Sequence, residues 1–456
     1  MGTIDDTSIA SPADAEHLSR RDLLTTAARL GAGLTLGGAA LGATMLEPRE
    51  ALAAGDRSSV ALSYWTHNFS PANVENKKFV REYMQRHPDV HITWDYSPHA
   101  NYEPKLLTAF AGGGGPDVYW GGDWLMPQFI PKNLVAPFDA AAYGVASQQA
   151  FVNRYDPHTF DAFMANGKLY TGGISEYNTF SLLYSKPLFR AAGIPYPSET
   201  KPMTWEQTAA IGQKLTRFSG GKRVRSGWEF VYNTPIWAVL QVEPMVRQLG
   251  GELVDATGKP QFDSAPVIRT MQFFHDVRMK YKANDPAFPS ADLGVDMARG
   301  RVAMWIAGIW AIAGIVQASP KMKGEIGVAP LPTWTRGGKR VTCKYAWAWY
   351  VNPRSAPQKQ REGWKFISFL TAHTNEWYDT CGYVEPLRNH WTYMLEKQPL
   401  LRIFRDDLTY ARYEFRSPHY FELSEVLNRA FQRIQSGGNP SSVMKSAQQE
   451  ALRAVR

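Results

Sequence analysis

The sequence predicts an α/β protein with a largely parallel sheet and more than one domain. From about residue 60 onward, segments with strand and helix periodicity alternate, which is the pattern of a sheet covered by helices. A chain of 456 residues is too long for one small domain, and its length fits two or three. Hydrophobic residues at 44% and charged residues at 20% are typical of a folded protein with a sizeable core.

Residues 1–53 have the layout of an export signal rather than of a folded segment. Arg20 and Arg21 precede a weakly apolar run that is rich in Ala, Gly and Leu. Ala51 and Ala53 then supply the small residues of an A-x-A cleavage site. We therefore expect a signal peptide over residues 1–53.

The type of signal follows from the residues around the arginines. SRRDLL at 19–24 resembles a twin-arginine export signal, which carries folded proteins across a membrane. Arg29 interrupts the apolar run and glycines thin it, which argues against a membrane-spanning anchor. Because no cysteine follows the small residues, we expect a periplasmic protein that begins near Ala54 and is not a lipoprotein.

The charge of the chain is positive but not concentrated. Residues 1–53 contain four Arg and seven Asp or Glu, so the whole-chain charge of +8 becomes +11 without them. This excess leaves an anionic partner open. The longest cluster of cations is SGGKRVR at 219–225, however, and we find no nucleic-acid-binding module. We therefore expect a diffusely basic surface and no nucleic acid partner.

Only two cysteines occur, Cys343 and Cys381. Disulfides persist outside the cytoplasm, but the sequence does not set the distance between two Cα atoms. A disulfide between the two cysteines and a pair of free thiols therefore both remain open. Further cysteines at zinc-ligand spacing are missing, so we expect neither a metal nor a cofactor.

The first elements can be assigned in order from periodicity. VALSYWTHNF at 60–69 is a strand that ends in an aromatic and polar loop. VENKKFVREYMQRH at 74–87 has apolar residues at helical spacing and stops before Pro88. VHITWDY at 90–96 alternates as a strand does, and YEPKLLTAF at 102–110 is a second amphipathic helix.

Four consecutive glycines, Gly112 to Gly115, follow the second helix. Phosphate-binding glycine loops lie between a strand and the N-terminus of a helix, where free N–H groups face the anion. Here the helix comes first, which argues against a phosphate site and places Gly112 as the helix C-cap. Pro116 and Asp117 then lead into a short buried strand, VYW at 118–120.

A second glycine pair, Gly121 and Gly122, comes just past that strand and precedes Asp123 and Trp124. In open α/β sheets, ligands bind outside the carboxyl ends of strands. Asp123 can cap the short helix that follows, and this role is compatible with ligand binding. We expect Asp123 and Trp124 to meet the polar rim and the apolar face of a ligand.

The rest of the chain continues the α/β pattern. We expect a hairpin-like return and a strand over 167–189, a helix with a capping box at Thr204 and Gln207 over 201–215, a turn unit and helix over 250–281, a short helix, strand and loop over 294–315, a strand over 345–352, and helices over 362–372, 424–438 and 441–455.

Several segments in this order carry a resemblance to a known family: GGGGPDVYW, LLYSKPLFRAAGIPYP followed by MTWEQ, LGGELVDATGKPQF, ARGRVAMWIAGIW, IGVAPLPT and GYVEPLRN. From about Val60 to the C-terminus, the chain resembles the family 1 extracellular solute-binding proteins of ABC importers. The resemblance implies a two-lobed periplasmic-binding-protein fold, in which two discontinuous α/β lobes are hinged around a ligand cleft.

Lobe boundaries also follow from the resemblance. It implies an N-terminal lobe of residues 54–174 plus 336–384 and a C-terminal lobe of residues 175–335 plus 385–456. The chain would cross between the lobes near Ser175 and Glu176, in the segment after LPT, and near Tyr383 to Pro386.

The resemblance further implies a set of ligand-binding residues. Aromatic rings cover the C–H faces of a sugar, while carboxylates, amides and Arg form hydrogen bonds with its hydroxyls. Of Trp347 and Trp349 in the returning strand, only one is expected to face the cleft, together with Tyr345. The expected ligand contacts are Trp65, Asn68, Asp123, Trp124, Glu176, Asn178, Trp310, Tyr345, Trp347, Tyr383, Glu385 and Arg388.

The function that the resemblance implies is binding rather than catalysis. We expect a monomeric receptor that captures a sugar or oligosaccharide and delivers it to the membrane permease subunits of an ABC transporter. A glycerophosphodiester, a polyamine or another solute remains an alternative on the same fold. A secreted glycoside hydrolase is a further alternative, with Asp123 and Glu176 as a carboxylate pair about 5 to 9.5 Å apart.

Overall fold

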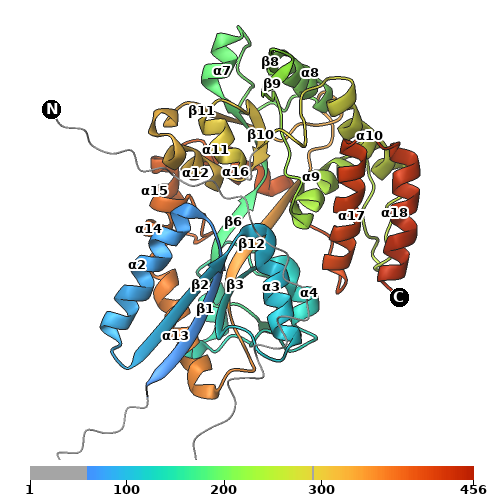
Figure 1. The fold of residues 1–456 in the computed structure, drawn as a ribbon. Coiled ribbons are helices and arrows are strands. Elements are labelled where there is room, and N and C mark those ends of the chain that lie inside the picture. The colour runs from blue at the N-terminus through green and yellow to red at the C-terminus, as the bar shows by residue number, and fades with distance from the viewer. Residues whose placement is uncertain (1–58, 290–291) are drawn as a thin grey trace, which may run out of the picture. The chain divides into compact units, whose positions relative to one another are not determined.

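A computed structural model of the chain describes residues 59–289 and 292–456 (Figure 1). The expected signal peptide, with Arg20, Arg21 and the cleavage site at Ala51 and Ala53, lies outside the described residues. Among the described helices, none combines the length and the apolar character needed to cross a membrane.

A six-stranded sheet contains the strands that begin the folded chain. Its members are β1 (Val60–His67), β2 (Val90–Ser97), β3 (Val118–Gly122), β6 (Ile174–Thr179), β12 (Thr342–Val351) and β13 (Ala411–Tyr413). The strand order is β13-β12-β3-β1-β2, and β6 also pairs with β12. β1 is parallel to both β2 and β3, and β12 is parallel to β13, but β12 runs antiparallel to β3 and β6. The expectation of a largely parallel sheet therefore holds for β1 to β3, whereas the returning β12 makes the whole sheet mixed.

Helices cover both faces of this sheet (Figure 1). On one face, Tyr64 of β1 lies edge-on to Phe366 of α13 (Pro357–Thr371), with ring centroids 5.3 Å apart, and its hydroxyl donates to Asn76 of α2 (Ser70–Arg86). On the other face, α3 (His99–Ala111) buries Tyr102, Leu106 and Phe110. Four shorter helices belong to the same parts of the chain. Three lie between β3 and β6, namely α4 (Met126–Phe129), α5 (Ala140–Tyr143) and α6 (Gln148–Val152), and α14 (Thr374–Cys381) follows α13.

A second, three-stranded sheet has the order β10 (Met304–Ala307), β7 (Ser181–Ser185) and β11 (Ile326–Ala329). Both outer strands run antiparallel to β7. Two small hairpins, β4 (Met164–Ala165) with β5 (Lys168–Leu169) and β8 (Arg217–Ser219) with β9 (Lys222–Arg225), complete the described strands. The remaining helices are α7 (Lys186–Ala191), α8 (Trp205–Leu215), α9 (Pro235–Gln248), α10 (Ala265–Met279), α11 (Leu293–Ala298), α12 (Trp310–Ala318), α15 (Trp391–Lys397), α16 (Leu401–Asp407), α17 (Tyr420–Gln435) and α18 (Pro440–Ala454).

The chain passes from one sheet to the other through adjacent segments. β6 belongs to the first sheet and continues through Phe180 directly into β7 of the second. β12 pairs with β6, and the N–H of Tyr177 in β6 donates to the carbonyl oxygen of Val384 at 2.9 Å. The segments around Glu176, β12 and Val384 therefore lie side by side, and together with the two sheets they form a two-lobed α/β fold.

Three local expectations can be compared with the structure. Gly112 is the C-cap of α3, as its place after the helix predicts. Thr204 and Gln207 form both hydrogen bonds of a capping box at the start of α8, so this prediction is confirmed. Cys343 and Cys381 are both buried and free, so of the two states that the sequence leaves open, the structure has the free thiols and no disulfide.

Candidate ligand-binding site

A cavity of about 620 Å³ is lined by residues from both sheets and from the segments beside them. Cavities of this size hold small organic ligands. Its lining is dominated by aromatic side chains: Phe69, Trp124, Phe180, Phe230, Tyr232, Trp237, Trp305, Trp310, Tyr345, Trp347 and Tyr383. The polar lining residues include His67, Asn68, His99, Glu176, Asn233, Thr234 and Asp292.

The end of β1 forms one wall of the cavity. The ring of His67 stacks on Trp120 with centroids 4.6 Å apart, and it lies edge-on to Trp347 at 4.6 Å and to His99 at 4.7 Å. Phe69 follows two residues later and lies edge-on to Trp310, with centroids 5.9 Å apart. The loop after the first strand therefore contacts side chains that belong to distant parts of the sequence.

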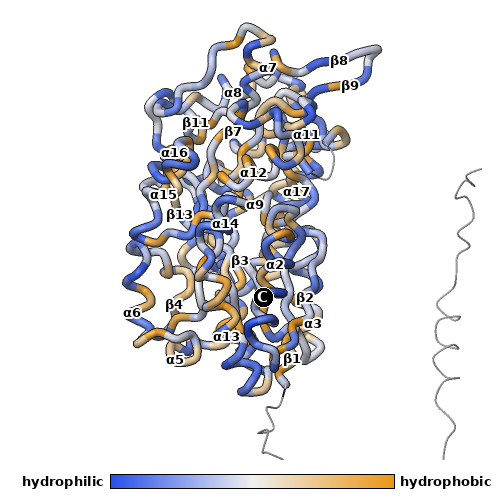
Figure 2. Tube along the Cα trace, turned by 90° about the vertical axis from the view of Figure 1, so that its left-hand side faces the viewer, coloured by the Kyte–Doolittle hydropathy of each residue, from blue (hydrophilic) through white to orange (hydrophobic). Residues whose placement is uncertain are grey.

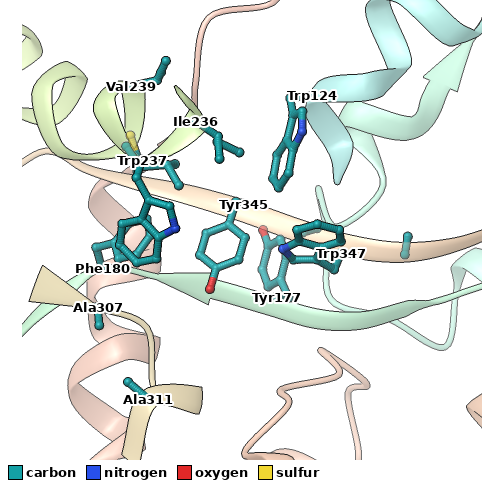
Figure 3. Close-up of a cluster of buried hydrophobic side chains, with 14 of the residues drawn as sticks. Trp124, Tyr177, Phe180, Ile236, Trp237, Val239, Ala307, Ala311, Tyr345 and Trp347 are labelled. Atoms are coloured by element: carbon teal, nitrogen blue, oxygen red, sulfur yellow. The ribbon is translucent and has the colours of Figure 1, made fainter. Parts of the chain in front are cut away.

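Three tryptophans form a second wall, which meets the first where Phe69 lies against Trp310. Trp237, in the first turn of α9, stacks on Trp305 of β10 with ring centroids 5.9 Å apart. Trp310, the first residue of α12, lies edge-on to Trp305 at 5.6 Å and to Trp237 at 6.2 Å. Figure 3 shows Trp237 on one side of Tyr345, and Trp347 and Trp124 on its other side. The three indoles pack against one another, so this wall of the cavity is apolar.

A glycine before Trp310 makes this packing possible. A Cβ on Gly308 would lie 2.5 Å from Trp310 Nε1 and 2.9 Å from the Tyr345 hydroxyl oxygen. Both distances are too short for a side chain, so only glycine allows the backbone to approach the two rings this closely.

A chain of hydrogen bonds joins three lining residues. Trp310 Nε1 donates to the Tyr345 hydroxyl, which donates to Glu176 Oε1. Asn178 Nδ2 donates to the same carboxylate oxygen at 3.3 Å. Burial raises the pKa of Glu176 to about 8, against the opposing effect of the hydrogen bonds from Tyr345 and Asn178. The Glu176 carboxyl is therefore mostly protonated and uncharged at neutral pH.

The two histidines of the cavity are also uncharged. Burial lowers the pKa of His99 to about 4, and burial together with the nearby His99 lowers the pKa of His67 well below its ordinary value. No Lys or Arg occurs among the described lining residues. Asp292, at an exposed position, is the other acidic residue of the described lining.

Two buried polar atoms of lining residues have no hydrogen-bond partner among the described residues. They are Nδ1 of His67 and Nε1 of Trp305. The side chains of His67 and Trp305 are 9% and 4% exposed, so bulk water reaches little of either. An unpaired buried polar group costs about 1–3 kcal/mol. Each atom has almost no exposed surface of its own, so a partner for the indole N–H or the imidazole nitrogen requires the surrounding side chains to move.

The structure brings seven of the twelve expected residues together in this cavity. They are Asn68, Trp124, Glu176, Trp310, Tyr345, Trp347 and Tyr383. Trp124 reaches the lining by folding back over the end of β3, where a Cβ on Gly122 would lie 2.2 Å from its indole. Its Nε1 donates to Glu103 Oε1 at 2.5 Å, which fixes the ring.

Asp123, Asn178 and Trp65 are placed elsewhere. Asp123 is fully buried, where Oδ1 accepts the N–H of Ala346 at 2.9 Å and Oδ2 pairs with Arg416 at 2.7 Å. Asn178 lies behind Glu176 rather than in the lining. Trp65 belongs to β1 itself, and its ring is covered by Lys105 Nζ, 4.3 Å from the ring centroid.

Glu385 and Arg388 are also outside the lining. Glu385 is buried and accepts hydrogen bonds from Tyr155 at 2.6 Å and Thr374 at 2.7 Å. Arg388 is exposed and donates through Nε to the carbonyl oxygen of Tyr155 at 2.7 Å. Both residues hold the segment around Tyr383 in place.

Of the tryptophan pair in β12, Trp347 lines the cavity and Trp349 does not. Residues two apart on a strand point to the same face, so alternation does not separate them. Their positions along the strand separate the two residues. Trp349 lies farther along β12, where its Nε1 donates to the Tyr64 hydroxyl at 3.0 Å in the core beneath α13. Trp349 is only 2% exposed.

Several lining residues were not expected from the sequence. His67 and Phe69 flank the expected Asn68, so the position of this tripeptide just after the first strand could have indicated that all three residues line the cavity. His99 and Trp237 belong to no motif of the sequence analysis, whereas Trp305 lies within ARGRVAMWIAGIW, where only Trp310 was expected to contact the ligand. The stretch from Phe230 to Thr234 lines the cavity as an irregular segment before α9, and only the arrangement of the whole chain reveals this role.

Comparisons with known proteins agree with this fold. Residues 71–377 match the family model of the bacterial extracellular solute-binding proteins. The arabinooligosaccharide-binding protein of Bacillus subtilis (strain 168) is 23% identical over 299 residues, which cover 63% of this chain and 64% of the relative. Its counterpart from Halalkalibacterium halodurans is 22% identical, with 60% of that relative covered, so this chain spans less than two thirds of the length of either relative.

Solved structures resemble the chain over most of its length. A solute-binding protein of an ABC transporter from Thermotoga lettingae, bound to α-D-tagatose, has a TM-score of 0.76 at 21% identity and covers 87% of this chain and 100% of its own. A maltose-bound protein of T. maritima has a TM-score of 0.74 at 20% identity, again covering 87% and 100%. These likenesses confirm the two-lobed α/β fold.

The family model spans well over half of the chain, and it runs from α2 through β12 to α14, across every element that lines the cavity except the end of β1 and Tyr383. The protein belongs to the bacterial extracellular solute-binding protein family.

Proposed function

We propose that this protein is an extracytoplasmic receptor that captures an uncharged oligosaccharide and delivers it to the permease subunits of an ABC transporter. The single observation that carries the proposal is the cavity, which is aromatic, free of Lys and Arg among its described lining residues, and also lined by the polar side chains of Asn68 and Glu176.

The chemistry of a sugar matches this lining. Indole and phenol rings cover apolar C–H faces, while the side chains of Asn68 and Glu176 can form hydrogen bonds with hydroxyls. The relatives named above for arabinooligosaccharide and maltose point to the same class of ligand. The volume of about 620 Å³ exceeds the need of one sugar ring, which favours an oligosaccharide.

Charged solutes fit this cavity less well. A glycerophosphodiester would place its phosphate in a cavity without a cationic side chain. A polyamine could lie against the aromatic rings, but its several ammonium groups would meet only two acidic side chains of the described lining, the exposed Asp292 and Glu176, and Glu176 is mostly protonated at neutral pH because burial raises its pKa to about 8. Each ionic group of such a solute that moves from water into these surroundings without a partner costs several kcal/mol.

Catalysis has little support in the arrangement of the carboxylates. Of the hydrolase pair Asp123 and Glu176, only Glu176 lines the cavity, and Asp123 is held by Arg416 and the N–H of Ala346. A glycosidase needs both carboxyls beside the scissile bond. We therefore propose binding without turnover, with no cofactor.

We propose the lobe boundaries that the sequence suggested, with residues 54–174 plus 336–384 in one lobe and residues 175–335 plus 385–456 in the other. The bond between Tyr177 N and Val384 O and the pairing of β6 with β12 support a hinge made of adjacent segments. A ligand that touches both walls stabilises the closed arrangement and shifts the population toward it. We further propose that the protein works as a monomer and reaches the periplasm through its twin-arginine signal.

A thermal-shift screen tests the ligand class. Uncharged di- and trisaccharides of arabinose, glucose and mannose form one arm, and glycerophosphocholine, glycerol 3-phosphate and spermidine form the other. A ligand at 100 times its Kd stabilises the folded state by about 2.7 kcal/mol, which raises Tm measurably. At least one uncharged oligosaccharide should raise Tm. A response confined to the charged solutes would refute the proposed ligand class.

A further inference from the structure

The basic cluster SGGKRVR forms a hairpin that the ligand cavity does not use. β8 and β9 pair antiparallel around Gly220 and Gly221, whose φ angles of 55° and 74° are those of a tight two-residue hairpin turn. Figure 2 shows the hairpin standing out from the neighbouring elements. It pairs with no other described strand.

Two arginines fix the hairpin to the body of the protein. Arg223 donates to the carbonyl oxygen of Lys282 and Arg225 donates to that of Gly300, both at 3.0 Å. An isolated two-stranded hairpin is marginally stable in water, so these bonds from its own side chains hold it in position. The hairpin is thus a fixed projection of the surface.

Its outer surface combines apolar side chains with cations. Phe218 is 54% exposed and Val224 is 48% exposed. Arg217 and Lys222 are exposed beside them, and the base of the hairpin adds further exposed cations at Lys214, Lys280, Lys282 and Arg299. Of the carboxylates nearby, Asp285 forms an ion pair with Arg278 at 2.6 Å, and Glu206 accepts a hydrogen bond from the Tyr281 hydroxyl at 3.2 Å.

We propose that the β8–β9 hairpin docks this protein onto an anionic lipid surface. The tip would place Phe218 and Val224 among the lipid headgroups, while the surrounding Lys and Arg side chains face lipid phosphates. Each cation close to an anionic bilayer contributes about 1 kcal/mol, and aromatic side chains at the interface add to this attraction. This surface would keep the receptor near the membrane whatever ligand it binds.

The size and charge of the hairpin favour a membrane over a protein partner. A stable protein interface buries about 800 Å² on each side, with an apolar centre of many residues. Here the exposed apolar part consists of two side chains, Phe218 and Val224, on a projecting hairpin (Figure 2) whose exposed residues also include Arg217 and Lys222. This pattern suits a negatively charged, deformable surface.

Vesicle flotation tests the proposal with the purified protein. Phosphatidylglycerol vesicles are compared with phosphatidylcholine vesicles at 50 mM and 300 mM NaCl. The double variant K214E/K222E reverses two exposed charges whose side chains make no hydrogen bond or ion pair among the described residues. We expect flotation with phosphatidylglycerol alone, a decrease at high salt, and at least a tenfold loss of binding in K214E/K222E. F218S should weaken binding several-fold with the charges unchanged.

A matched control separates the hairpin from general charge. K77E/R81E makes the same change in net charge at exposed positions of α2, far along the chain from the hairpin. It should retain at least half of the wild-type flotation, and all variants should keep the wild-type Tm within a few degrees. Equal loss in both double variants, or equal flotation with both lipids, would overturn the proposal. So would the absence of flotation together with loss of solute uptake by cells carrying K214E/K222E, because the hairpin would then serve a protein partner.

Discussion

At the scale of single residues, Glu176 shows how burial sets the character of the cavity. Its carboxyl accepts from Tyr345 and Asn178, yet burial still raises its pKa to about 8. The folded pKa lies above the ordinary value of 4.5, so the folded state holds this proton longer than the unfolded chain does. Between pH 4.5 and about pH 8, the contribution of Glu176 to stability therefore falls as pH rises.

The variant E176Q tests this residue directly. The amide keeps the shape of the side chain and does not titrate, so E176Q should lose less stability between pH 5 and pH 8 than the wild type. Titration of Glu176 changes the free energy of unfolding by at most about 1.4 kcal/mol per pH unit, and E176Q should lack this contribution. Urea unfolding at both pH values measures it. Identical pH dependence in E176Q and the wild type would show that Glu176 titrates normally.

The two thiols give a second prediction at this scale. Cys343 and Cys381 are buried, and burial raises the pKa of both thiols. A thiol reagent such as dithionitrobenzoate should react with neither in the folded protein and with both after unfolding in guanidinium, without any reductant. Thiols that appear only after a reductant is added would show that a disulfide forms instead.

At the scale of elements, the GGDW stretch at the end of β3 has a different use from the one its residues suggested. Asp123 ties β3 to Ala346 of β12 and to Arg416, so it joins elements and does not face the cavity. Trp124 does line the cavity, and Gly122 leaves the space into which its indole folds. The glycine therefore acts by making room for a neighbouring side chain.

Substitution of Gly122 should accordingly destabilise the protein. In G122A, the added Cβ would lie 2.2 Å from the Trp124 indole and force the ring to move. Overpacking of this kind costs about 1–3 kcal/mol. G114A is the matched control, because a Cβ there meets only Ala109 O at 3.7 Å. Urea unfolding should show a clear loss for G122A and little change for G114A, and equal effects would argue against this packing.

The elements also show which features of the fold could be predicted from the sequence. The caps at Gly112 and Thr204 depend on neighbours within four residues, so local patterns predicted both. Helix α9, which carries Trp237, was not predicted. Thirteen of its fourteen residues are buried, so it has no polar face to mark the helical period, and Pro244 lies inside it. The partners of Asp123 are distant in sequence, which is why its role was not apparent.

At the scale of the whole molecule, the ligand site arises from segments that the two sheets bring together. β12 supplies Tyr345 and Trp347, β6 supplies Glu176, and α9, β10 and α12 supply the wall of tryptophans. The resemblance to a known family predicted the fold and seven of the lining residues. It did not predict the wall formed by Trp237 and Trp305, because their place in the lining depends on the packing of α9 against β10.

The most direct test of the cavity as the ligand site compares two half-buried tryptophans. Trp310 lines the cavity, whereas Trp65 lies under Lys105 outside it, although both were expected to touch the ligand. Isothermal titration with the oligosaccharide that raises Tm most should give at least a tenfold weaker affinity for W310A, as expected when an aromatic contact of more than about 1.4 kcal/mol is lost. W65A should bind within twofold of the wild type. Unchanged binding in W310A, or a larger loss in W65A, would contradict the assignment of this cavity.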